Sequence, residues 1–340
     1  MTAAATAAHA EPDLPPGVRR VPIPIPWPMG AINVYLVEDD PLTLVDSGPN
    51  FDVALRALER GLAEHGRRVE DIGRIVLTHE HIDHIGLASE VARRSDAEVC
   101  AHADLVEWIT DQPGRVAGER AYVDRLMRRH GVSEEAIERL RMRDHTLDSW
   151  DPSVEVGHPL ADGDTLRFAG GEWTVMTRPG HSPFDTLLHD EARGYAFSGD
   201  HLISHISSNP VLTPLGLAPE DADMRARRPR ALATYRDSLR LSLNLGDPLA
   251  LPGHGRPIAR PRRLVQRRLA EIDERGRKFD AIVAERARTA HEVAAAVWGK
   301  AAFEQPDLTL YEVLGHSDLL HDAGLVDEVE RDGVVVLEHR

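Results

Sequence analysis

The chain has 340 residues, of which 42% are hydrophobic and 28% are charged, and its formal net charge at pH 7 is −16. This composition is typical of a globular protein with one large domain and one smaller domain. The negative charge opposes a polyanionic partner, so we expect no DNA partner and disfavour RNA, and no apolar run approaches the roughly 20 residues of a membrane helix.

Two features near the start of the chain bear on where the protein functions. Residues 1–17 lack both the basic and the apolar regions of a secretory signal, and we expect them to form a disordered tail. Cys100 is the single cysteine, so no intramolecular disulfide can form and export to an oxidising compartment would bring no stabilisation. We therefore expect a cytoplasmic protein without a membrane-spanning segment.

The first third of the chain alternates short β-like runs with turns and helices. Residues 32–37 and 42–48 predict a hairpin, and residues 51–65 predict a helix because their apolar side chains recur at helical spacing. The continuous apolar run at 73–78 predicts a buried strand. A short helix and a further strand at 97–102 follow it.

The middle of the chain begins with a helical insertion at about residues 104–147. Its apolar side chains at helical spacing predict packing against the body of the protein, and the insertion is also a candidate lid over the functional site. A helix is expected from about 219 to 243. The short strands expected on either side of that helix are 165–170, 172–177, 186–190, 195–200 and 248–255. Strands interleaved with helices in this way predict an α/β layered domain.

The sequence after Gly255 is almost entirely helical. A helix is expected at about 261–298, two short helices near 309–324, and a closing hairpin whose turn contains Asp332 and Gly333. Three helices and a hairpin in about 85 residues form the outline of a winged helix. The chain therefore divides into a tail, a catalytic domain, and a helical linker with a winged-helix domain, at residues 1–17, 18–256 and 257–340.

The segment LTHEHIDHIG, residues 77–86, places three histidines and an aspartate directly after a predicted strand. Three more side chains that can bind metals follow short strands at glycine-containing turns, where the backbone can bend sharply. A lone histidine at a strand end is more often an ordinary loop residue, but seven such groups together favour a metal site. The seven residues are His79, His81, Asp83, His84, His181, Asp200 and His254.

The chemistry of these side chains indicates which metal they would bind. Imidazole and carboxylate groups without thiolate suit zinc, with manganese or iron as alternatives. Seven groups are too many for one tetrahedral ion but suit two Zn²⁺ ions, each with an open position for water. Zinc lowers the pKa of bound water from about 15.7 toward about 7, so hydroxide becomes available at neutral pH. The sequence therefore predicts a binuclear hydrolase.

In these motifs the sequence resembles the metallo-β-lactamase superfamily of metal-dependent hydrolases. The resemblance covers about residues 18–256 and includes H-x-H-x-D-H at 79–84 and LVDSG at 44–48. It implies a four-layer αββα sandwich with the metals at one edge of the sheets, followed by a winged-helix domain. The implied ligands are His79, His81 and His181 for one ion, Asp83, His84 and His254 for the second, and Asp200 as a bridge between them.

Other polar residues are candidates for supporting roles. Asp83 is also a candidate proton shuttle. Asp46 of the LVDSG segment is expected to orient the site loops through hydrogen bonds. After Asp200, the residues His201, His205 and Asn209 are expected to line the substrate mouth, with an ordinary surface loop as the alternative.

The resemblance to the glyoxalase-II-like branch implies a small-molecule acyl substrate, namely a thioester or an ester, with a lactone also open. The alternative function is a metal-dependent endoribonuclease acting on single-stranded RNA, because a related branch with a winged helix has that activity. The arginine-rich stretch at 260–288 supports the alternative, and the overall acidity opposes it. The winged helix is expected to pack on the catalytic domain, to line the substrate entrance or to join two copies as a homodimer.

Overall fold

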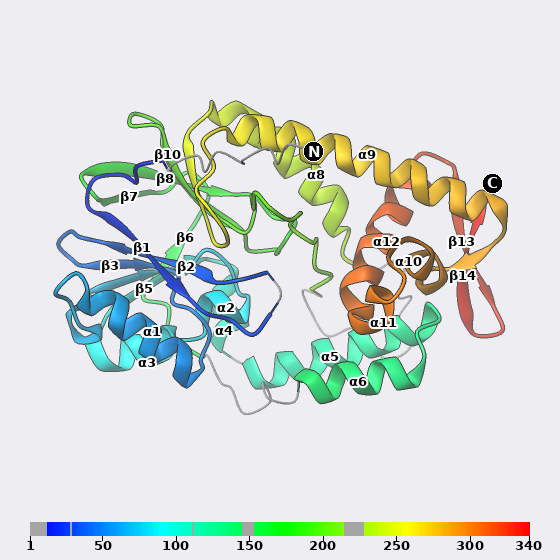
Figure 1. Ribbon diagram of the computed structural model, residues 1–340, viewed down its shortest axis with the longest axis horizontal. Coiled ribbons are helices and arrows are strands. Elements are labelled where there is room, and N and C mark those ends of the chain that lie inside the picture. Colours follow the sequence, from blue (N-terminus) through cyan, green and yellow to red (C-terminus); the bar gives the residue numbers. More distant parts are fainter. Residues whose placement is uncertain (1–11, 28, 111, 145–152, 214–227) are drawn as a thin grey trace, which may run out of the picture.

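The computed structural model describes residues 12–27, 29–110, 112–144, 153–213 and 228–340. Two β-sheets pack face to face, helices cover their outer faces, and a C-terminal unit lies beside them (Figure 1). Most of the expected tail, residues 1–11, falls outside the described ranges. Of the rest of that segment, Leu14 packs against the core between the two sheets.

The first sheet has six strands, hydrogen-bonded in the order β1-β2-β3-β4-β5-β6. The first three strands pair antiparallel and the last four pair parallel. The predicted hairpin at 32–48 is confirmed as the antiparallel pair of β2 and β3, whereas β6 was not predicted. The strands are β1 (Val18–Ile23), β2 (Ile32–Val37), β3 (Thr43–Val45), β4 (Arg74–Val76), β5 (Glu98–His102) and β6 (His158–Leu160).

The second sheet has five strands in the order β11-β10-β9-β8-β7. All pairs are antiparallel except β10 with β11. All five strands predicted for this part of the chain are confirmed. They are β7 (Thr165–Phe168), β8 (Gly171–Thr177), β9 (Thr186–Asp190), β10 (Tyr195–Gly199) and β11 (Leu249–Pro252).

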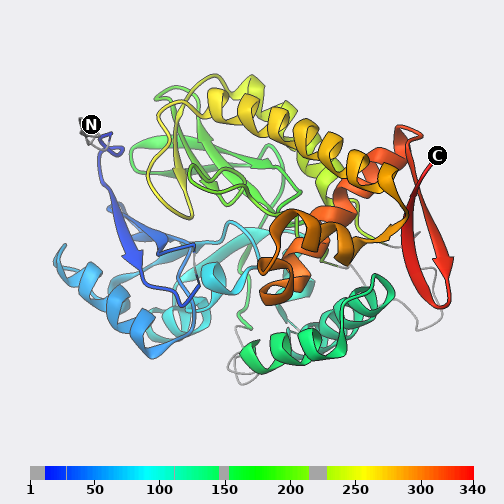
Figure 2. The same cartoon turned by 45° about the vertical axis from the view of Figure 1, so that its right-hand side comes forward.

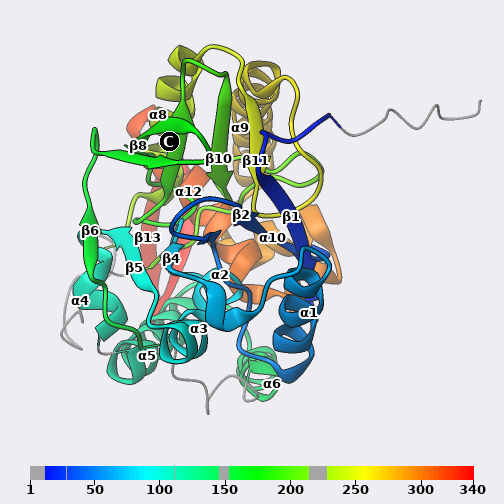
Figure 3. The same cartoon turned by 90° about the vertical axis from the view of Figure 1, so that its left-hand side faces the viewer.

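Apolar side chains of both sheets, including Tyr35, Val76, Trp173 and Phe197, form the core between the sheets. Helices α1 (Asp52–Ala63), α3 (Ala88–Ser95) and α4 (Leu105–Thr110) cover the outer face of the first sheet. Helix α8 (Ala231–Ser242) and the first half of α9 (Pro261–Glu285) cover the second sheet. Figure 3 shows these four layers, which confirm the expected αββα order.

Helix α9 extends from the second sheet to the C-terminal unit (Figure 1). This unit contains three helices and a three-stranded sheet in the order β12-β14-β13. The insertion forms α4 on the first sheet and then α5 and α6, which lie against the C-terminal helices (Figure 2). The elements are α5 (Gln112–Arg129), α6 (Glu134–Asp144), α10 (Ala290–Trp298), α11 (Ala301–Glu304), α12 (Pro306–Asp322), β12 (Arg288–Thr289), β13 (Val326–Arg331) and β14 (Val334–His339).

Buried side chains attach the insertion to the C-terminal unit. Tyr122 and Leu126 of α5 pack in one core with Val293 of α10 and Leu314 of α12. The packing expected for the insertion is therefore present, and its partner is largely the C-terminal unit. None of the helices in the described part of the chain is both long enough and apolar enough to cross a membrane.

The helix predicted at 261–298 is wrong in one place. Helix α9 ends at Glu285, and Arg288–Thr289 pair instead with β14 as a short strand. The two short helices expected near 309–324 form the single helix α12. The helix expected from 219 begins at Ala231 in the described residues, and positions 214–227 lie outside them.

Candidate metal centre

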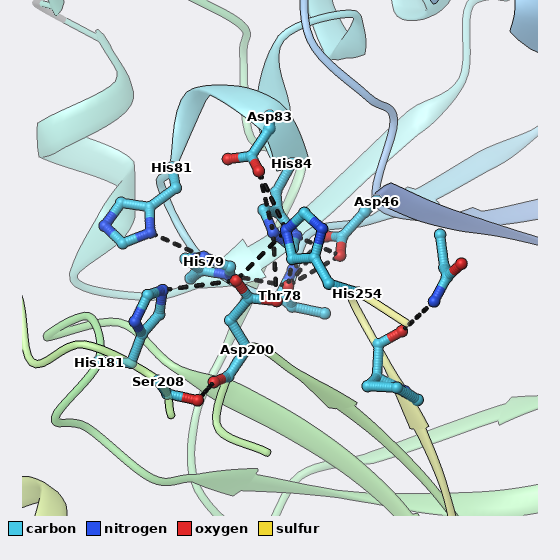
Figure 4. A network of polar contacts seen from close by, with 12 residues as sticks. Asp46, Thr78, His79, His81, Asp83, His84, His181, Asp200, Ser208 and His254 are labelled. Atoms are coloured by element: carbon cyan, nitrogen blue, oxygen red, sulfur yellow. Dashed lines mark hydrogen bonds and ion pairs between the residues drawn. The ribbon is translucent and has the colours of Figure 1, made fainter. Parts of the chain in front are cut away.

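The seven residues identified in the sequence converge at one edge of the sandwich (Figure 4). The loop after β4 and the short helix α2 (Ile82–Ile85) supply four of them, from the first sheet. The ends of β8, β10 and β11 supply the other three, from the second sheet. The four from the first sheet are His79, His81, Asp83 and His84, and the three from the second are His181, Asp200 and His254.

The donor atoms of these residues form three overlapping groups, and within each group all donor atoms lie within 4.8 Å of one another. The groups are His79, His81 and His181; His79, His84 and Asp200; and Asp83, His84 and His254. In the first group, Nε2 of His79 lies 3.0 Å from Nδ1 of His81. Three imidazoles at such distances can share a cation, and this arrangement is typical of a transition-metal site.

Asp200 lies between the groups at the two ends of the site. Its Oδ2 atom is 3.7 Å from Nε2 of His181 and 3.5 Å from Nε2 of His254. Its Oδ1 atom is 3.5 Å from Nε2 of His84. This one carboxylate faces both clusters of ligands. That is the position required of a ligand shared by two ions.

Hydrogen bonds from outside the site fix the orientation of three buried imidazoles. Nδ1 of His84 donates to Oδ2 of Asp46 at 2.8 Å. The carbonyl of Asn209 accepts from Nδ1 of His181 at 2.8 Å, and that of Ala31 from Nδ1 of His254 at 3.1 Å. With Nδ1 engaged, Nε2 of each ring is directed into the site, as in metal sites where the second nitrogen is held from behind.

The inward atoms have no hydrogen-bond partner among the described residues. Nε2 of His84, His181 and His254 and Oδ1 of Asp200 are all buried in this state. Such atoms are costly to bury unless something else satisfies them. Four unsatisfied donor atoms facing one another fit divalent metal ions, which would accept all of them.

Gly253 is required for the space inside the site. A Cβ atom at this position would lie 2.4 Å from Oδ1 of Asp200 and 2.5 Å from Cε1 of His84. No real side chain could make these contacts. The glycine before His254 therefore keeps the region between the donor groups open.

The electrostatics of the site come from burial and from the closeness of the groups. Burial and the neighbouring histidines hold the pKa of His79 well below its ordinary value. Burial alone would lower the pKa of His84, but the carboxylates of Asp46 and Asp200 raise it well above its ordinary value. Burial opposes ionisation of Asp200, yet the surrounding histidines lower its pKa. The carboxylate thus stays ionised, as a metal ligand must be.

The supporting residues expected from the sequence have different positions in the structure. Asp46 is buried, and besides His84 it accepts hydrogen bonds from the backbone and hydroxyl of Thr78. Asn209 lines the cleft in front of the metal centre, whereas His205 is exposed, bonded to the carbonyl of Met29 and absent from the cleft wall among the described residues.

The expectation that His201 lines the substrate mouth is wrong. Its side chain is fully buried, and its Nε2 atom is hydrogen-bonded to Oγ of Ser242 on α8 at 2.9 Å. In the turn after β10, Asp200 points to the metal centre and His201 points toward α8. Burial lowers the pKa of His201 to about 3.

Sequence reasoning missed a polar connection between the two ligand loops. Glu80 and Asp185 are both buried, and Ser182 joins them by donating its hydroxyl to Glu80 and its backbone N–H to Asp185 at 2.9 Å. Burial raises the pKa of Glu80 to about 7. The motif itself contains Glu80, but its partner is 102 positions away, so no local signal indicates the contact.

Comparison with known proteins agrees with this geometry. The family model of the metallo-beta-lactamase superfamily matches residues 27–254. A Bacillus subtilis (strain 168) protein named probable metallo-hydrolase YqjP is 30% identical over 298 residues, which are 88% of this chain and 90% of the relative.

Two solved structures resemble the whole chain. A metallo-beta-lactamase family protein from Thermus thermophilus has 26% identity and a TM-score of 0.79, over 95% of this chain and 99% of its own. A beta-lactamase domain protein from Burkholderia ambifaria has 26% identity and a TM-score of 0.81, over 97% and 94%. Together with the family match and the clustered histidines and aspartates, these likenesses lead to one conclusion: the chain belongs to the metallo-beta-lactamase superfamily of metal-dependent hydrolases.

Proposed function

We propose that the protein is a binuclear zinc hydrolase that cleaves a thioester, an ester or a lactone, as the glyoxalase-II-like branch does. The observation that carries this proposal is the position of Asp200 between two groups of imidazoles, in which the inward Nε2 atoms of His181 and His254 lack a hydrogen-bond partner in the described residues. One ion alone would leave part of this set unsatisfied.

The proposed ligands follow the distances in the site. Zinc is preferred because the donors are imidazoles and carboxylates without a thiolate, and manganese or iron would use the same set. One ion would be held by His79, His81 and His181, the second by Asp83, His84 and His254, and Asp200 would contact both.

Bound metal ions would supply Lewis acidity, which lowers the pKa of water and polarises a carbonyl group. The reaction adds water to the carbonyl carbon, breaks the C–S or C–O bond and returns a proton to the departing sulfur or oxygen. We assign the proton transfer to Asp83, whose carboxylate lines the cleft and lies 3.1 Å from Nε2 of His254. Neighbouring histidines keep its pKa low in spite of burial, so it is ionised and able to accept a proton.

We propose that the C-terminal unit, 257–340, is a helical linker with a winged helix that serves as a wall of the substrate cleft. Its hairpin carries five acidic side chains and one arginine, and Glu330 and Asp332 are exposed. This surface opposes a phosphate backbone, which supports a role other than DNA binding. We also propose that the protein is located in the cytoplasm and assembles as a homodimer.

The second candidate is an endoribonuclease acting on single-stranded RNA. The observation in its favour is the exposed basic face of α9, which includes Arg262, Arg263 and Arg267. The net charge of −16 opposes it, because a negative field repels an RNA chain.

The deciding experiment compares metal-loaded and chelated protein on matched substrates. Bound metal is measured by mass spectrometry, and hydrolysis of thioesters, esters, lactones, bis(p-nitrophenyl) phosphate and single-stranded RNA is followed in parallel. We expect about two zinc ions per chain and metal-dependent cleavage of acyl substrates. Cleavage of RNA alone, with a steep dependence on salt, would reverse the two candidates.

A further inference from the structure

The cleft that contains the metal centre extends far beyond it. Its volume is about 1920 Å³, roughly twice the upper end of the range for small-molecule sites. Asp83, His181 and Asp200 line one end. The insertion, helices α10 to α12, the loop after β1 and the segment 203–213 line most of the rest, so much of the wall belongs to elements outside the metal centre.

Large aromatic side chains are concentrated in the wall of this cleft. Of the five tryptophans in the chain, Trp27, Trp108 and Trp298 line it, together with Phe303. They come from the loop after β1, from α4, from the end of α10 and from α11. Phe303 is 44% exposed, which is costly for a phenylalanine unless something covers it.

A direct contact connects this wall to the metal centre. The side-chain amide of Asn209 donates to the carbonyl of Leu308 on α12 at 3.0 Å. The carbonyl of the same Asn209 accepts from His181. Leu308 and Asn209 both line the cleft. Asn209 therefore connects the apolar wall to His181, a proposed ligand.

Several basic side chains of the cleft are paired with acidic groups, either within the cleft or beside it. Arg275 is paired with Glu312, and Lys300 with Glu304 at 2.5 Å. Arg141 is held by Asp124 outside the cleft wall. A strongly anionic substrate would need unpaired cations, whereas an apolar chain needs only accessible apolar surface, which Trp298 and Phe303 offer.

We propose that the acyl group of the substrate is a long apolar chain, which lies along Leu308 and Trp108 and ends against Trp298 and Phe303. This inference rests on the proposed acyl hydrolysis and names its substrate class. The C-terminal unit then selects the substrate by chain length, because two of these four side chains belong to α10 and α11 and one belongs to α12.

The first test measures kcat/KM for acyl thioesters of N-acetylcysteamine from acetyl to dodecanoyl, each below its micelle concentration. We expect kcat/KM to rise roughly three- to fourfold for each methylene that the cleft buries. A flat profile with clear hydrolysis of the acetyl thioester would overturn the chain-length inference and leave the proposed function standing.

The second test locates the apolar site. Phe303→Ala and Trp298→Ala should each reduce the ratio of kcat/KM for dodecanoyl over acetyl by about tenfold or more. The matched control is Leu241→Ala, because Leu241 is 53% exposed on α8 and does not line the cleft. An unchanged ratio in Phe303→Ala, whose exposed side chain can be removed without unfolding, would overturn the assignment.

A binding measurement keeps the inference testable without turnover. Dodecanamide and acetamide are titrated into chelated protein while tryptophan emission is recorded, in the wild type and in Phe303→Ala. We expect dodecanamide to bind saturably to the wild type and acetamide not to bind. Dodecanamide should bind about tenfold more weakly to Phe303→Ala. Absence of dodecanamide binding would overturn the inference. Absence of acyl hydrolysis with dodecanamide still bound would overturn the proposed function instead.

Discussion

The carboxylate of Asp46 accepts a hydrogen bond from Nδ1 of His84 at 2.8 Å, and this contact directs the opposite nitrogen of the ring into the metal centre. In Asp46→Asn, the shape is kept and the negative charge is lost. We expect about 10- to 100-fold weaker metal binding, as for other residues that hold a ligating histidine from behind. Competition with a chromophoric zinc chelator measures the affinity.

The control for Asp46→Asn is Asp52→Asn at the start of α1. The side chain of Asp52 is 93% exposed, and its ion pair is with Arg56 on the same helix. This variant should bind metal as the wild type does. Equal affinities in all three proteins would contradict the orienting role of Asp46.

Loss of one proposed ligand is expected to remove the metal. His81→Ala deletes one member of the three-histidine group, and Asp200→Ala deletes the carboxylate that faces both groups. Both variants should lose bound metal and activity while their circular dichroism stays that of the folded protein. His205→Ala is the control, because His205 is exposed and lies outside the cleft wall in the described residues. Full activity in either ligand variant would refute the two-ion assignment.

A single methyl group at position 253 is expected to displace the donor groups of the metal centre. In Gly253→Ala, the new Cβ would meet Oδ1 of Asp200 at 2.4 Å, so the donor groups must move apart. We expect bound metal to fall below half of the wild-type content, measured by mass spectrometry. Gly157→Ala is the matched control, since its Cβ would make only an ordinary contact of 3.5 Å with Glu98. Normal metal content in Gly253→Ala would contradict the inference that position 253 has no room for a side chain.

The buried His130 at the end of α5 is expected to make stability depend on pH. Burial lowers the pKa of His130 to about 4, from an ordinary value of about 6.5. Between these values the unfolded chain binds a proton that the folded protein does not, so stability falls as the pH drops from 6.5 toward 4. The loss contributed by His130 should reach about 2 kcal/mol at pH 4.5.

Urea unfolding of chelated protein at pH 7 and pH 4.5 measures this loss, in the wild type and in His130→Gln. Other acid-sensitive groups are common to both proteins and cancel in the comparison. We expect the variant to lose about 2 kcal/mol less than the wild type on acidification. Parallel losses in the two proteins would rule out the titration of His130.

The layers and the first four candidate ligands could be predicted from the sequence because their signals are local. His79, His81, Asp83 and His84 stand within six positions, directly after a strand that apolar residues reveal. The hydrogen bonds that orient them could not be predicted in this way. The partners of His181 and His254 are backbone carbonyls 28 and 223 positions away, and a carbonyl leaves no mark in a sequence.

The C-terminal region shows the opposite case, in which a local signal was present and was overlooked. Thr289 and Glu292 form a reciprocal capping box, which starts α10 and therefore ends any continuous helix before it. The T-x-x-E pattern precedes an apolar run, so the break is readable. His201 was misplaced for a different reason. It lies in the turn after β10, which ends at Gly199, and in this turn Asp200 faces the metal centre while His201 faces α8.

The division of the metal centre between the two sheets has a thermodynamic consequence. Four donor residues belong to the half of the sandwich before α3, and three belong to the half that starts with β7. Metal ions held there would link the two halves reversibly at one edge of the sheets. Metal binding would then stabilise the contact between the two halves, and separation of the halves would weaken metal binding to the same extent. Hydrogen exchange of the amides around His84 and His254 should slow together on metal loading, although 170 positions separate them in the chain.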